Sequence, residues 1–135
     1  MAPIYIEVFA SVIADSQVAQ VGTVTVLLLI LMDVLFGTGA AIVQHRFSSE
    51  KMRKGIGHKA AELGFLVLGI ITDGALLGGF DFGISAMCYV AICAYLAVME
   101  LGSVMETLAL LNPQLASSPL FKMLDEIHAK ENPNG

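Results

Sequence analysis

The chain has 135 residues, of which 56% are hydrophobic and 14% are charged, and its formal net charge is −5. Soluble domains carry about 25% charged residues, so this composition and a mean hydropathy of +0.78 predict one small membrane protein. The acidic balance argues against nucleic-acid binding, because affinity for phosphates needs a basic surface.

Residues 1–20 form an apolar run that Glu7 and Asp15 interrupt. The run is too short and too charged to cross a bilayer. It predicts an amphipathic helix that lies on the membrane interface or docks on the other helices. No basic region precedes the next apolar run, as a secretory signal requires, so we expect that run to remain as a span.

Residues 21–43 predict the first transmembrane helix and contain one ionisable residue, Asp33. A helix of about 23 residues reaches roughly 34 Å, enough to cross a hydrocarbon layer of about 30 Å. An ordinary soluble helix is not apolar on every face over such a length. Small and polar residues share one face at spacings of four, three and four, namely Asp33, Gly37, Ala40 and Gln44.

Residues 44–59 are expected to form a basic cytoplasmic loop, because short loops rich in Lys and Arg stay on that side. Within this loop, Ser48 or Ser49 can cap a short helix, and Gly55 and Gly57 loosen the backbone before the next span. This range holds five of the chain's seven Lys and Arg residues: Arg46, Lys51, Arg53, Lys54 and Lys59. Two interpretations stay open, contact with anionic lipid and a topology signal alone. With three spans, a cytoplasmic loop here places the N-terminus outside and the C-terminus in the cytoplasm.

Residues 60–80 predict the second span. Glu62, Gly69 and Asp73 share a face of this helix, and Gly74 and Gly78 have the spacing that permits close helix packing in membranes. A short external turn at residues 81–83 predicts an antiparallel hairpin with the third span.

Residues 84–106 predict the third span, which must include Glu100 because the uncharged part before it is too short to cross. A seam with polar residues follows a heptad-like spacing through Tyr89, Cys93, Leu96, Glu100, Ser103 and Thr107. Cys88 and Cys93 point in different directions on a helix, so we expect no disulfide between them.

Residues 107–135 are expected to form a cytoplasmic amphipathic tail. Asn112 and Pro113 stop the third helix, and Ser118 caps a short helix with Pro119 at its first position. The expected fold class is therefore all-α: an integral membrane protein with three transmembrane helices and an amphipathic helix at each end.

The sequence contains no pattern typical of an enzyme, a metal site or a cofactor site, and its three histidines are expected on the surface. The informative residues are acids at membrane depth, where a central acid costs roughly 2.5–3.5 kcal/mol. No Lys or Arg is expected inside a span to pair with them, so they either line a wet lumen or subunit contact, or form protonated helix–helix contacts. Candidates for lining a pore or for helix contact are Asp33, Gly37, Glu62, Gly69, Asp73, Gly74, Gly78, Glu100, Ser103 and Glu106.

The order of these features over about residues 22–125 resembles the bacteriophage holin family, which also includes clostridial toxin-secretion holins. The resemblance rests on an apolar run ending in Asp33-x-x-x-Gly37-x-x-Ala40-Ala41, a basic loop with Ser48-Ser49 and Gly55 before Lys59, a hairpin, and Glu100-x-x-Ser103-x-x-Glu106. The last motif commonly ends in Glu-Asn in that family, whereas Thr107 follows Glu106 here.

The resemblance implies a homo-oligomer that forms holes in the bacterial cytoplasmic membrane and so releases a cell-wall hydrolase (endolysin) or a toxin. The hydrolase would be a functional partner without direct contact, and the lipid bilayer and other copies of the chain would be the physical partners. Two alternatives remain: a small proton-coupled multidrug-type transporter, which would use an intramembrane acid, and a passive membrane anchor or assembly subunit.

Overall fold

The structure is a computed structural model that describes residues 3–84 and 86–131 of the chain. It is 83% helical, and the described residues contain no strand, which confirms the predicted fold class. The helices follow in the order α1 (Ile4–Ala14), α2 (Gln17–Val43), α3 (Ser49–Leu77), α4 (Tyr89–Leu111), α5 (Pro113–Ala116) and α6 (Pro119–Glu131).

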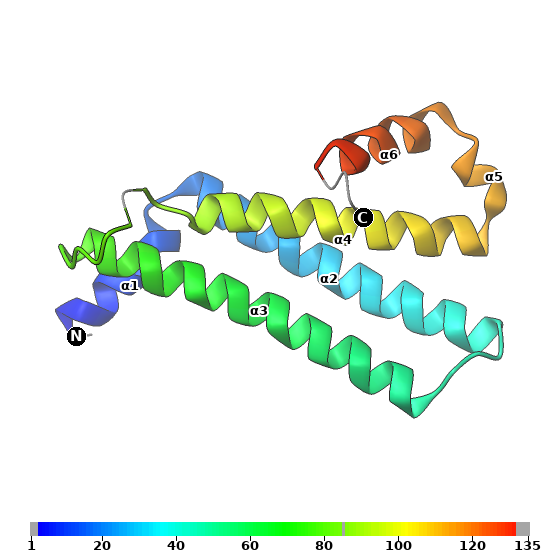
Figure 1. The fold of residues 1–135 in the computed structure, drawn as a ribbon, viewed down its shortest axis with the longest axis horizontal. Helices are drawn as coiled ribbons and strands as arrows, with labels where there is room; N and C mark the ends of the chain where they lie inside the picture. Colours follow the sequence, from blue (N-terminus) through cyan, green and yellow to red (C-terminus); the bar gives the residue numbers. More distant parts are fainter. Residues whose placement is uncertain (1–2, 85, 132–135) are drawn as a thin grey trace.

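Three of these helices, α2, α3 and α4, are long and apolar enough to cross a membrane. Figure 1 shows them as an elongated bundle in which α2 and α3 join at one end, while α3 and α4 join at the other. Helix α4 packs along α2 and also against α3. The protein is therefore a multi-pass membrane protein in which α4 holds the other two long helices together.

The helix bounds differ from the predicted ranges. Helix α3 begins at Ser49, so the short helix expected within residues 44–59 and the second span form one continuous helix without a break at Gly55 and Gly57. The Ser48 hydroxyl caps this helix by accepting a hydrogen bond from the Lys51 amide at 3.2 Å. Helix α4 covers Tyr89–Leu111 in place of residues 84–106, so the connection before it is longer than the expected turn at 81–83.

Two residues after the end of α2 and of α3, the chain has a residue in the left-handed conformation, His45 with φ 53° and Gly79 with φ 84°. After α2, the His45 amide donates to the Ile42 carbonyl and the Arg46 amide donates to the Ala41 carbonyl. This is the Schellman arrangement, which satisfies the last carbonyls of a helix and turns the chain sharply. It lets α3 begin within a few residues of the end of α2.

The interior of the bundle is small and partly polar, whereas its exterior is apolar. The buried hydrophobic cluster consists of Val12, Ala19, Val26, Leu66, Tyr89, Ile92, Cys93 and Leu96. Within it, the Thr23 hydroxyl donates to the Ala19 carbonyl at 2.6 Å, so the Tyr89 hydroxyl donates to Thr23 at 2.7 Å. Large side chains such as Leu28, Leu31 and Leu35 on α2 are exposed. An exterior of this kind suits contact with lipid chains.

The two short amphipathic helices dock on the long ones. Helix α1 places the Phe9 ring directly against Gly74 of α3, at the end of the bundle opposite the α2–α3 connection (Figure 1). Helix α6, which begins with Ser118 as its cap, folds back on α4, where His128 Nδ1 lies 3.1 Å from the Val98 carbonyl oxygen. The His128 ring packs against Gly102, so it is not the plain surface residue that the sequence predicted.

Candidate functional site

One side chain at the centre of the bundle, Lys59 of α3, joins carboxylates from all three long helices. Its Nζ lies 2.5 Å from Glu100 Oε1 of α4, 2.9 Å from Asp33 Oδ2 of α2 and 3.4 Å from Glu62 Oε2 of α3. We call these four residues the charge cluster. Its ion pairs connect the three long helices to one another.

Two acids of the charge cluster are buried, Asp33 and Lys59 are half-buried, and the cluster has one lysine for three acids. The exposed fraction is 1% for Glu100 and 6% for Glu62. Both oxygens of Glu62 and the Oε2 atom of Glu100 have no hydrogen-bond partner among the described residues. The His58 ring lies 3.0 Å from Glu62 Oε1, but this histidine is largely exposed. Three carboxylates therefore share one lysine, with an exposed histidine at the edge.

This imbalance has a physical consequence for the bundle. A buried ion pair contributes little net stability, since the desolvation of its charges offsets most of their attraction, and a carboxylate oxygen without a partner adds a further cost. Water would solvate the same groups at much lower cost. A surplus acid can avoid this cost either by taking up a proton inside the bundle or by moving into contact with water.

A second buried acid on the same helix, Asp73, is in a different situation. Its Oδ1 accepts a hydrogen bond from the Cys88 amide at 2.7 Å, and its Oδ2 accepts one from the Tyr89 amide at 2.8 Å. These amides belong to the first residues of α4, where free N–H groups and the helix dipole favour a negative charge. Asp73 therefore fixes the start of α4, and both of its oxygens are satisfied.

The glycines on α3 are points of close approach inside one chain. A methyl group at Gly69 would lie 2.9 Å from Ile92 Cδ1 and 3.0 Å from Tyr89 Cδ2, so this glycine lets α3 reach α4. Gly74 makes room for the Phe9 ring of α1, and Gly78 lies at the end of α3 near Val8.

The other candidates are scattered. Gly37 has nothing within 4 Å of the position of an added methyl group, so it is not a helix contact in this structure. Ser103 is half-buried, and its carbonyl accepts a hydrogen bond from the Thr107 hydroxyl at 3.1 Å. Glu106 is exposed and lies outside the charge cluster. The candidates thus separate into one charge cluster, one helix cap, packing glycines and surface positions.

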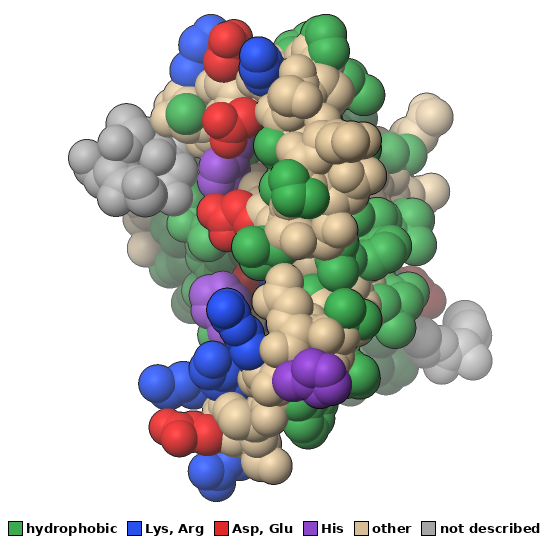
Figure 2. All heavy atoms as spheres, turned by 90° about the vertical axis from the view of Figure 1, so that its right-hand side faces the viewer, with side chains coloured by type: hydrophobic (Ala, Val, Ile, Leu, Met, Phe, Trp, Pro, Cys, Tyr) green, Lys and Arg blue, Asp and Glu red, His purple; other side chains and the backbone are tan. Residues whose placement is uncertain are grey.

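The basic segment also separates into two parts. Figure 2 looks at the end of the molecule where α2 joins α3; one group of Lys and Arg side chains lies at the lower left of this view, and a second group lies at the top. Arg46, Lys51, Arg53 and Lys54 are exposed, whereas Lys59 turns inward to the acids. From the sequence we expect no basic partner for the acids, whereas Lys59, one residue before the predicted second span, contacts three of them.

Lys59 was missed because it was assigned to the loop before the second span. One sequence pattern could have indicated its role. Lys59 and Glu62 are three residues apart, so their side chains are neighbours if the helix of the second span begins before Lys59. The two cysteines are free, as expected, with Cys93 buried and Cys88 Sγ 3.2 Å from the Thr72 hydroxyl. Within residues 3–84 and 86–131, no three His, Cys, Asp or Glu side chains are grouped in a way that would hold a metal ion.

Comparison with known proteins agrees with this architecture. The bacteriophage holin family matches residues 17–129, from the start of α2 almost to the end of α6. No curated protein and no solved structure matches the chain. Since the match covers most of the chain, including all three apolar helices, the protein belongs to the bacteriophage holin family.

Proposed function

We propose that this protein oligomerises in the bacterial cytoplasmic membrane and forms holes through which an endolysin, or a toxin in a secretion system, leaves the cell. The charge cluster is the observation that carries this proposal. A hole needs helix faces that water can wet, and Asp33, Glu62 and Glu100 come from three different helices that are long and apolar enough to cross a membrane.

The described bundle fits the resting state of such a protein. Its exterior is apolar, while its acids face inward onto one lysine with several oxygens left without a partner. If neighbouring copies supply the helix packing, the inward faces can turn to a water-filled lumen, where the carboxylates are solvated. Assembly then becomes favourable once the packing between copies is more stable than the packing of three helices within one copy.

The proposed orientation places the α2–α3 connection in the cytoplasm, because four exposed basic residues are concentrated there. The N-terminal helix α1 lies at the other end of the bundle and is then external. The C-terminal tail returns to the cytoplasmic side.

A leakage assay tests the proposal. The purified protein is reconstituted into liposomes that contain a small dye and a fluorescent dextran of protein size. A hole-forming protein is expected to release both solutes above a threshold protein density. Release of neither solute would contradict the proposal and would favour an anchor. Transport of small cations only with a proton gradient would favour a proton-coupled transporter.

A second measurement addresses assembly. Chemical crosslinking in the same liposomes, below and above the leakage threshold, is expected to give higher oligomers as leakage begins. Monomers alone at densities that leak would show that one chain forms the hole and would overturn the proposed homo-oligomer.

A further inference from the structure

A groove between α2 and α3 stands out from the rest of the surface. It has a volume of about 490 Å³ and is lined mainly by apolar side chains and glycines from the two helices. This volume lies within the range of about 300–1,000 Å³ that is typical of small-molecule sites. Its lining includes Val34, Gly37, Met52, Gly55, Ile56 and Leu63.

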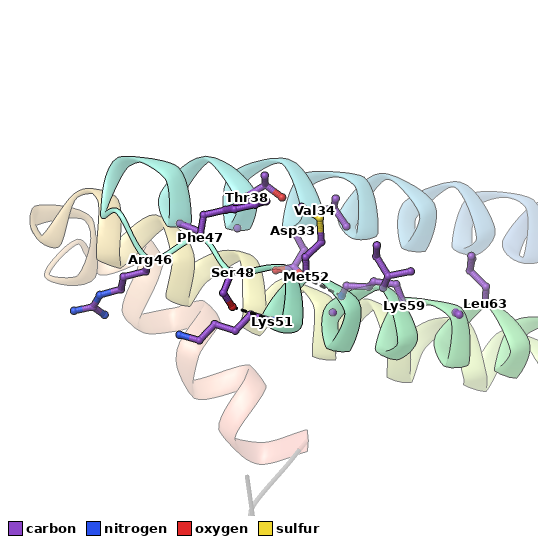
Figure 3. Close-up of a pocket in the computed structure, with 15 residues that line it drawn as sticks. Asp33, Val34, Thr38, Arg46, Phe47, Ser48, Lys51, Met52, Lys59 and Leu63 are labelled. Carbon is purple, nitrogen blue, oxygen red and sulfur yellow. Dashed lines mark hydrogen bonds and ion pairs between the residues drawn. The ribbon is translucent and has the colours of Figure 1, made fainter.

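The charged side chains that line the groove lie at two places. Arg46 and Lys51 lie at one end, and Figure 3 shows both side chains extending outward in the same direction, away from the apolar part. The single acid among its lining residues, Asp33, is already paired with Lys59 at 2.9 Å. A ligand that fits would have a long apolar part and one anionic group at the basic end.

The shape of the groove suits one of two apolar occupants better. A helix of a second copy is about 10–12 Å across with its side chains, so it would cover the groove without filling it. An acyl chain is a single file of methylene groups and can lie along the whole groove. The two basic side chains also have a ready partner in a lipid phosphate.

We propose that this groove binds one anionic phospholipid of the adjacent leaflet, with an acyl chain between α2 and α3 and the phosphate at Arg46 and Lys51. The lipid completes the packing of two helices that meet each other mainly through the Asp33–Lys59 ion pair. This site does not depend on hole formation, and its test uses lipid binding alone.

The chain offers matched variants for the test. Gly37 and Gly55 line the groove, and an added methyl group at either glycine meets nothing within 4 Å, so Gly37→Leu and Gly55→Leu fill the groove without a clash at their first side-chain carbon. Gly39 and Gly57 lie on the same two helices with equally open surroundings but do not line the groove. Gly39→Leu and Gly57→Leu are therefore the controls.

The experiment uses the full chain in nanodiscs with a phosphatidylglycerol that carries a photoreactive diazirine in its acyl chain. Mass spectrometry then locates the labelled residues. We expect labelling concentrated on the groove residues of α2 and α3. The two groove-filling variants should lose most of it, whereas the two controls should retain it. Protection of the buried Cys93 from a thiol reagent confirms that each variant is folded.

The headgroup is tested separately by competition. Unlabelled phosphatidylglycerol should displace the probe better than phosphatidylcholine, and this preference should fall by about fivefold for each basic residue removed at Arg46 and Lys51. Arg53→Gln with Lys54→Gln removes the same charge outside the groove and should change the preference little. Uniform labelling of all exposed faces, equal competition by both lipids, or crosslinks that place a second copy in the groove would each overturn the proposal.

Discussion

Helix α3 carries two buried acids that differ in almost every respect except burial. Asp73 has an exposed fraction of 1% and accepts a hydrogen bond at each oxygen from the backbone at the start of α4. Glu62 has an exposed fraction of 6%, and its oxygens make no hydrogen bond among the described residues; they lie only within ion-pair distance of His58, at 3.0 Å, and of Lys59, at 3.4 Å. Burial alone therefore does not tell whether an acid in a membrane helix stabilises the fold.

The difference indicates two roles for acids within one bundle. At the end near α1, the carboxylate of Asp73 is matched by two amides and acts as a structural cap. In the charge cluster, three acids share the one positive charge of Lys59, so the closed bundle contains more acidic groups than basic partners for them. The first acid should stabilise the resting state, whereas the surplus acids of the cluster should limit its stability.

The largest effect is expected from removing the shared cation. Lys59→Met leaves three buried or half-buried carboxylates without their counter-charge and should lower the free energy of unfolding by about 3–5 kcal/mol. The rate at which a thiol reagent labels Cys93 in nanodiscs measures this loss, because Cys93 is buried in the folded bundle. Lys54→Met, at an exposed position of the same helix, is the control. An unchanged labelling rate for Lys59→Met would show that the lysine does not hold the cluster.

The helix cap should give the next largest loss. In Asp73→Asn, one side-chain oxygen still accepts a hydrogen bond, but the charge and the second acceptor are gone. Since a hydrogen bond to a charged group contributes about 1.5–3 kcal/mol, we expect a loss of about 2 kcal/mol in the same thiol assay. An Asp73→Asn variant as stable as the wild type would show that Asp73 does not stabilise the start of α4, and its proposed structural role would be wrong.

Glu62→Gln should act in the opposite direction. It removes one surplus negative charge from the charge cluster, and replacement of buried charges is often neutral or stabilising. We expect a gain of about 1 kcal/mol in unfolding free energy, together with a higher protein density at which liposomes begin to leak. A loss comparable to that of Asp73→Asn would mean that both acids are structural, and the proposed imbalance would be wrong.

The smallest effect is expected at Glu106, an exposed acid outside the charge cluster. Glu106→Gln should change the unfolding free energy by less than about 0.5 kcal/mol, as is usual for surface positions away from specific contacts. This variant sets the baseline for the other three in both the thiol assay and the leakage assay. A large change in leakage alone would place Glu106 at a contact between copies.

The sequence predicts the class of fold well because the bilayer imposes a simple rule on length and polarity. A span needs about 20 apolar residues, and three helices of this kind are present where three were expected. The bounds were less accurate because they depend on caps. Ser48 starts α3 before the apolar part begins, and Asp73, far away in sequence, sets where α4 begins.

The candidate site was predictable only in part. The acids were found because a charge at membrane depth is conspicuous in any sequence. Their partners were not found, since the partner of Asp73 is backbone and the partner of Glu100 is a lysine 41 positions away in the chain. Such pairings depend on how the helices dock, which local spacing does not encode.

The cation of the charge cluster belongs to α3 alone, whereas α2 and α4 contribute only acids to it. Because Lys59 contacts carboxylates of both neighbouring helices, a departing α3 would deprive Asp33 and Glu100 of their counter-charge at the same moment. Loss of α2 or α4, by contrast, would leave Lys59 with the remaining acids. We therefore expect α3 to be the helix whose movement opens a lone subunit in one step.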